Sequence, residues 1–132
     1  MRVGEEMAVT AKQVYDIALV LIDEVLENGN IIADQPDYYQ AKAKTILTTL
    51  QSELLPNDIK PPIITDLTQE MLLSDRMAIS VLPYGLAAHL LIQEDLGTAS
   101  FFNARYDELK RKNSYSSISP IVDVYDTLGG MV

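Results

Sequence analysis

His89 is the residue best suited to acid–base or metal chemistry, because it is the only histidine in a chain that also lacks cysteine. It lies in the apolar run LAAHLLI, and no second histidine or cysteine is available to share a metal ion. The acidic pairs are adjacent in the sequence, so their carboxylates diverge on a helix, whereas a dicarboxylate site needs spacings of three or four residues. These pairs are Asp23 with Glu24, Glu94 with Asp95, and Asp107 with Glu108. We therefore predict a core or interface histidine, no catalytic, cofactor-binding or metal-ligating residue, and no enzymatic activity.

One enzymatic alternative stays open, a site built around Tyr84, His89 and the neighbouring acids Glu94 and Asp95. It requires a defined pocket that holds His89, and a buried His89 among leucines would exclude it. The Tyr84–Gly85 pair follows Pro83 and is explained more simply as part of a helix kink.

The composition indicates one acidic domain. The 132 residues include 10 basic and 19 acidic side chains, a net charge of −9. Such a surface repels phosphates, so general nucleic-acid binding is not expected. The start of the sequence does not resemble a signal peptide, and the longest apolar runs are far shorter than the ~20 residues that span a bilayer. We expect a soluble protein with no membrane partner.

Two amphipathic helices are predicted in the first half. The first begins after the N-cap Thr10 and runs to about Glu27, where Asn28 and Gly29 end it. Its apolar stripe consists of Val14, Ile17, Ala18, Leu21, Ile22 and Val25. The second begins near Asp34 and Pro36 and runs to about Leu55, with an inward stripe of Tyr39, Ala43, Ile46, Leu47, Leu50 and Leu54.

The second half is predicted to contain a broken apolar helix and an amphipathic one. Ser74 is the expected N-cap, and Pro83 must kink or restart the helix because it lacks an N–H group. Apolar residues lie all round this helix, so it belongs in the middle of a bundle or between subunits. Leu96 and Gly97 are expected to end it, and Thr98 to cap a last helix that runs to Lys112.

Two segments without a helical pattern complete the chain. Residues 57–71 contain Pro61 and Pro62 and form a long loop, either a plain crossover packed by its isoleucines and leucine or an interface. After Lys112 the composition turns to serine and β-branched residues, which indicates an extended, apolar tail. We predict an all-α fold, a small bundle of about four helices over residues 10–112, with a flexible extension at 1–9 and the extended tail at 113–132.

Residues 81–112, VLPYGLAAHLLIQEDLGTASFFNARYDELKRK, resemble the core of small head–tail connector proteins from tailed bacteriophages and prophages, the adaptor or head-completion proteins of the neck. The C-terminal SISPIVDVYDTLGG is similar to the tail of those proteins. The resemblance covers roughly residues 9–130 and consists of a packing pattern rather than a catalytic motif. The last residues, LGGMV, depart from the pattern, so no role is carried over to them.

The resemblance implies a structural virion protein of the neck, present in the bacterial cytoplasm during assembly. About a dozen copies would form a ring beneath the portal protein, continue the DNA channel, and offer a platform to the tail or to a tail-completion or stopper protein. DNA would be passing cargo only, and no cofactor is implied. On this basis we expect subunit or portal contacts at Phe101, Phe102, Tyr106, Ile121, Val124 and Tyr125. An alternative from a different class stays open, a cytoplasmic acidic helical adaptor or regulatory domain that binds a protein partner.

Overall fold

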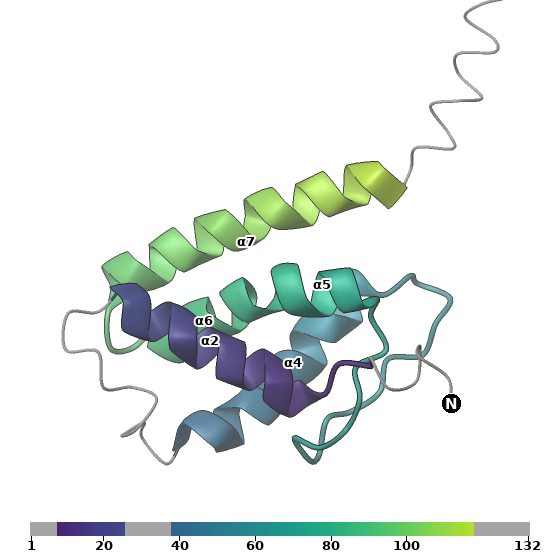
Figure 1. Cartoon of the computed structure of the whole chain (residues 1–132), viewed down its shortest axis with the longest axis horizontal. Helices are drawn as coiled ribbons and strands as arrows, with labels where there is room; N and C mark the ends of the chain where they lie inside the picture. The colour runs from purple at the N-terminus through teal and green to yellow at the C-terminus, as the bar shows by residue number, and fades with distance from the viewer. Residues whose placement is uncertain (1–7, 26–37, 118–132) are drawn as a thin grey trace, which may run out of the picture.

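The described part of the chain is a small bundle of α-helices (Figure 1). The computed structural model describes residues 8–25 and 38–117. In chain order its helices are α2 (Ala11–Val25), α4 (Tyr38–Leu54), α5 (Asp75–Ser80), α6 (Leu82–Leu91) and α7 (Leu96–Ser117). These residues contain no β-strand, only an isolated bridge between Thr10 and Glu70. The predicted all-α class is confirmed, and α5 with α6 corresponds to the one broken helix of the prediction.

The central element is α6, which contacts α2, α4, α5 and α7. In Figure 1, α7 lies along one side of the bundle and α2 crosses in front of α6. Eight of the ten residues of α6 are buried. The position agrees with the prediction that the helix with apolar residues all round lies in the middle of the bundle.

The break between α5 and α6 has the predicted local cause. Ser74 caps α5, because its Oγ accepts a hydrogen bond from the N–H group of Met77 at 3.3 Å. Val81 separates the two helices, and Pro83 lies in the first turn of α6, where its missing N–H leaves no intrahelical bond unmade. The chain therefore restarts a helix at the proline instead of continuing one through it.

The start of α2 is a capping box. The N–H group of Gln13 donates to Thr10 Oγ1 at 3.2 Å, and the N–H group of Thr10 donates to Gln13 Oε1 at 2.9 Å. The predicted stripe is buried at Val14, Ala18 and Ile22, but Ile17 and Leu21 are only half-buried. The other buried positions of α2 are Ala11, Tyr15 and Leu19. The predicted end at Asn28 and Gly29, like the predicted start of α4 near Asp34 and Pro36, lies outside the described residues.

The loop between α4 and α5 is fixed to both of the first two helices. Its carbonyl groups at Leu67 and Gln69 accept hydrogen bonds from the first turn of α2, at 2.7 and 2.8 Å. From α4, Thr48 Oγ1 accepts the N–H group of Ile64 at 2.8 Å. The backbone groups of an irregular segment would otherwise form hydrogen bonds with water, and here they bond to the two helices instead. The loop is a packed crossover, with Ile64 buried and Ile63 exposed.

The same loop explains a buried polar residue that the sequence did not reveal. Gln51 lies on α4 with no exposed surface, and its Oε1 accepts the N–H group of Leu72 at 2.6 Å. The sequence placed only apolar residues on the inward face of α4. The glutamine is buried there because the loop offers it a backbone donor.

Four predicted boundaries are wrong. Helix α6 ends at Leu91 rather than near Leu96, and α7 already begins at Leu96. Its N-cap is Asp95 rather than Thr98, since Thr98 donates through its N–H group and its hydroxyl to the Asp95 carboxylate, at 3.1 and 2.8 Å. These bonds, the backbone one first, hold the pKa of Asp95 below its usual value.

The other two differences concern the ends of the domain. Val9, assigned to the N-terminal extension, is buried, and its carbonyl group accepts the N–H group of Met71 at 2.8 Å. Helix α7 continues to Ser117, beyond the predicted end at Lys112. The rest of the predicted tail, residues 118–132, and residues 1–7 lie outside the described part of the chain.

Candidate interaction site

The three aromatic residues predicted as contact anchors on α7 divide between core and surface. Phe102 is 1% exposed and Tyr106 is 4% exposed, so both belong to the core of the chain itself. Phe101 is 56% exposed, and its ring lies 5.4 Å from that of Phe102. Of the three, only Phe101 is placed to contact a partner. The remaining predicted contacts, Ile121, Val124 and Tyr125, lie outside the described residues.

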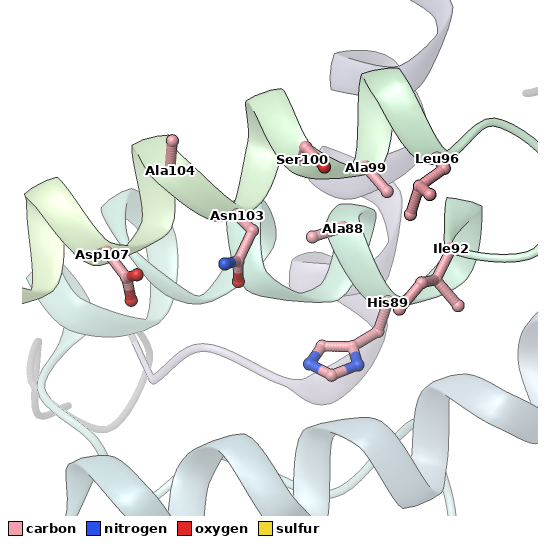
Figure 2. A pocket seen from close by; sticks show the side chains of 9 residues that line it. All are labelled: Ala88, His89, Ile92, Leu96, Ala99, Ser100, Asn103, Ala104 and Asp107. Carbon is pink, nitrogen blue, oxygen red and sulfur yellow. The ribbon is translucent and has the colours of Figure 1, made fainter.

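His89 is not a core residue, contrary to one of the two predicted placements. It is exposed on α6, where it lines two hollows of about 340 and 420 Å³. Figure 2 shows its ring projecting from α6 away from α7. Because both hollows share His89, we describe them together as the α6 groove. Its lining residues are Ala41, Lys42, Thr45 and Ile46 of α4, Ala88 and His89 of α6, Ile92, and Leu96, Ala99, Ser100, Asn103, Ala104 and Asp107 of α7.

The α6 groove has an apolar end and a more polar one. Ile92 and Leu96 are 52% and 66% exposed where α6 turns into α7. Further along α7, the groove is lined by the polar side chains of Asn103 and Asp107 (Figure 2). An exposed concave surface of mixed small and apolar residues is typical of a protein–protein contact.

Two tyrosines at the start of α4 fix the geometry of this groove. The hydroxyl of Tyr39 donates to Glu94 Oε1 at 2.9 Å, and that of Tyr38 donates to Glu94 Oε2 at 2.5 Å. Both bonds join α4 to the turn between α6 and α7. Lys42 lies one turn further along α4, with its Nζ 4.9 Å from the centre of the Tyr38 ring. The two walls of the groove are therefore linked at the end where Ile92 and Leu96 are exposed.

The residues of the enzymatic alternative do not form one site. Tyr84 packs against Phe102, with ring centres 6.2 Å apart, and lines neither of the hollows that His89 lines. Glu94 accepts the two tyrosine hydroxyls, and Asp95 caps α7. His89 itself is exposed, so it is not the buried histidine that would have excluded the alternative. Tyr84 and His89 thus have different surroundings on α6, and Glu94 and Asp95 lie beyond its end with partners of their own.

Residues 8–25 and 38–117 offer neither a metal site nor a membrane-spanning helix. No group of three or more histidine, aspartate or glutamate side chains there is arranged to hold a metal ion. None of the helices in that part is both long and apolar enough to cross a bilayer.

Because several tyrosines are buried, the stability of the folded chain should depend on pH in the alkaline range. We expect the free energy of unfolding to fall as the pH rises from about 10 to about 12. Burial, and then the charge of Asp16, raises the pKa of Tyr15 from 10.0 to about 12. Burial, and then the hydrogen bond to Glu94, also raises the pKa of Tyr39. In this window the unfolded chain has lost phenolic protons that the folded chain still holds, so each increment of pH favours unfolding. Urea denaturation at a series of pH values measures the effect.

The matched control is Tyr39→Phe. It removes one of the titrating hydroxyls, so the variant should show a shallower alkaline decline than the parent chain. It should also be less stable at neutral pH, because Glu94 loses one of its donors. A parent chain whose stability stays level up to pH 12 would contradict the expectation.

Comparison with known proteins gives no relative: no family model, curated protein or solved structure matches this chain.

Proposed function

We propose that this protein is a structural subunit of a phage head–tail connector, which assembles into a ring beneath the portal and carries out no reaction. The ring would continue the DNA channel and offer the attachment platform for the tail. The proposal starts from the sequence resemblance of residues 81–112 to such proteins. What the structure adds in its support is the surface that this segment presents.

The observation that carries the proposal is the exposure of large apolar side chains along this segment. Residues 81–112 correspond to the central helix α6, the turn after it, and most of α7, which packs against α6. Although the segment supplies much of the core, it leaves Ile92, Leu96 and Phe101 more than half exposed. A subunit that is covered by other copies after assembly needs such a surface, because contact cores are enriched in aromatic and apolar residues.

The charge of the chain is compatible with this function. A net charge of −9 gives a surface that does not neutralise phosphates, so DNA passing a ring of such subunits would not be held. The predicted tail contacts at Ile121, Val124 and Tyr125 remain part of the proposal, as the means by which one subunit attaches to the portal or to a neighbour.

Electron microscopy of the protein mixed with the portal protein of the same phage genome tests the proposal. We expect rings stacked coaxially on portals with the full chain. We expect no stacking with a chain that ends at Ser117, although its circular dichroism spectrum stays helical, because the described helices are all retained. A full chain that forms a small stable oligomer and never binds portals would overturn the proposal and favour the acidic adaptor instead. If the truncated chain still stacks on portals, the tail contacts at residues 118–132 are not needed for attachment, and that part of the proposal is wrong.

A further inference from the structure

We propose that residues 118–132 fold back onto their own chain before assembly and occupy a hollow beside the C-terminal half of α7. One part of the inference rests on the proposed function: attachment to the portal has to displace these residues from the hollow. Three features of the chain support the docking, namely an open apolar hollow, the point at which α7 ends, and the placement of charge.

The hollow has a volume of about 370 Å³ and lies where the end of α4, the crossover loop, α5 and α7 meet. Figure 1 shows α5 and the C-terminal half of α7 at the same end of the bundle. We call it the α7 hollow and define it by six of its lining residues, Glu53, Ile59, Leu72, Met77, Lys110 and Asn113.

Two large apolar side chains line the α7 hollow without being buried. Ile59 is 42% exposed and Leu72 is 57% exposed. Beside them, Met77 is only partly buried against the core. Covering such side chains removes apolar area from water, which is favourable. A segment with apolar residues of its own would therefore be stabilised in this hollow.

The residues that follow α7 are placed to reach the hollow. Asn113 lines it, and α7 ends at Ser117, four residues or about 6 Å further along the helix axis. The sequence continues for 15 residues after Ser117, which span up to about 50 Å when extended. Pro120 disfavours a helical conformation at Ser119, so the sequence favours a change of direction soon after α7.

Attachment to the same chain favours this segment over a second copy. Its apolar residues include Ile118, Ile121, Val122, Val124 and Tyr125. A segment joined to its site by a short linker has an effective concentration there on the order of millimolar. A weak contact within the chain therefore forms before the same contact with another copy at lower concentration.

Three consecutive basic residues lie beside the α7 hollow. Lys110 lines it, and Arg111 and Lys112 follow directly. Their position does not serve to complement the C-terminal end of the helix dipole, because α7 continues to Ser117 and its last turn has no basic side chain. Positive charge thus gathers at the edge of the hollow in a chain whose net charge is −9.

Residues 118–132 supply the opposite charge. They carry two acids, Asp123 and Asp126, and no basic side chain. Asp107 compensates Lys110 only weakly, since its Oδ1 lies 3.9 Å from Lys110 Nζ. The lining also includes the acid Glu53, which is exposed and therefore screened by solvent. Opposite charge thus adds to the apolar contact and orients the docked segment.

Disulfide formation tests the docking directly, because the chain has no cysteine of its own. Leu72→Cys places a thiol in the α7 hollow, and Val122→Cys places one on the segment. Under mild oxidation the double variant should form a disulfide within one chain, seen as a faster band in a denaturing, non-reducing gel. A tenfold dilution should leave the rate unchanged.

The matched control combines Val122→Cys with Ile79→Cys. Ile79 is 47% exposed on α5 but does not line the α7 hollow, so the tether is retained and the site is changed. We expect this pair to form its disulfide at least fivefold more slowly than the Leu72 pair. Equal rates would overturn the inference, and so would dimers that disappear on dilution, since they would show that a second copy fills the hollow.

A charge reversal tests the electrostatic part of the contact. Lys110→Glu in the Leu72→Cys, Val122→Cys chain should slow the disulfide severalfold, and adding Asp123→Lys should restore the rate. An unchanged rate with Lys110→Glu would overturn this part of the inference.

The same double variant tests displacement by the portal. The oxidised chain, with its segment held in the hollow, should not stack on portals in electron micrographs, and a reducing agent should restore stacking. Equal stacking by the oxidised and reduced chains would overturn the displacement. Stacking without any disulfide within the chain rejects the docking and leaves the connector function standing, whereas a rapid disulfide in a chain that never binds portals rejects the connector function and leaves the docking.

Discussion

Replacing Phe102 with alanine should lower the free energy of unfolding by about 3–5 kcal/mol, whereas the same change at Phe101 should alter it by less than about 0.5 kcal/mol. The two residues are adjacent on α7, but Phe102 is 1% exposed and Phe101 is 56% exposed. Phe102 lies beside Tyr84, through which α7 packs on α6. Its truncation leaves a cavity that the surrounding helices fill only in part, and the loss of buried area adds to that penalty.

The pair is its own control, because both variants lose the same side chain from the same helix. Urea denaturation followed by circular dichroism measures both values. Phe101→Ala should keep the stability of the parent chain but weaken stacking on portals, since Phe101 is exposed whereas the other two aromatic anchors predicted on α7, Phe102 and Tyr106, are buried. Equal losses of stability in the two variants would show that the arrangement of α7 on α6 is wrong.

The parts of the fold that could be read from the sequence are those with a local cause. Thr10 and Ser74 cap their helices through side chains that bond backbone groups three residues away, so the signal lies within one turn. Pro83 breaks a helix wherever it lies in one. The central position of α6 followed from apolar residues on all of its sides, which is a property of ten consecutive positions.

The boundary between α6 and α7 could not be predicted from the neighbouring residues alone. Asp95 and Thr98 are both good N-cap residues, and Gly97 is a common helix terminator, so the sequence alone favoured a later start. The structure selects Asp95 because contacts distant in sequence fix the turn. Tyr38 and Tyr39 bind Glu94 from the start of α4, and Phe102 and Tyr106 must face α6. Neither condition is visible in the residues of the turn.

The candidate site was harder to predict than the fold. His89 stands among apolar neighbours, which predicted a core or interface position, yet it is exposed while Ala88 beside it is buried. The spacing of His89 and Ile92 gave a signal, since both lie on the same side of α6 and both line the groove. The walls of the groove come from α4 and α7, and their relative placement is a tertiary property that no local pattern encodes.

The close approach of three helices at Gly85 leads to the second large effect. A Cβ atom at this position would lie 2.9 Å from Leu50 Cδ1 on α4 and 2.9 Å from two ring atoms of Tyr106 on α7. Both neighbours are buried, so neither can move aside into solvent. Gly85→Ala should therefore destabilise the protein by about 1–2 kcal/mol, although alanine is the better helix former by about 1 kcal/mol. Gly85→Val adds further atoms at the same point and should lower the free energy of unfolding by about 3 kcal/mol or more.

Gly97→Ala separates packing from helix propensity. Gly97 lies in the first turn of α7, and a Cβ atom there would meet only Asp95 Oδ1, at an ordinary contact distance of 3.7 Å. The same substitution should thus leave stability unchanged or raise it by up to about 1 kcal/mol. Measured by urea denaturation, opposite signs for the two glycine-to-alanine changes are the expected result. If both variants gained stability, α6 would lie farther from α4 and α7 than the structure shows. The position of α6 beneath the α6 groove would then also be wrong.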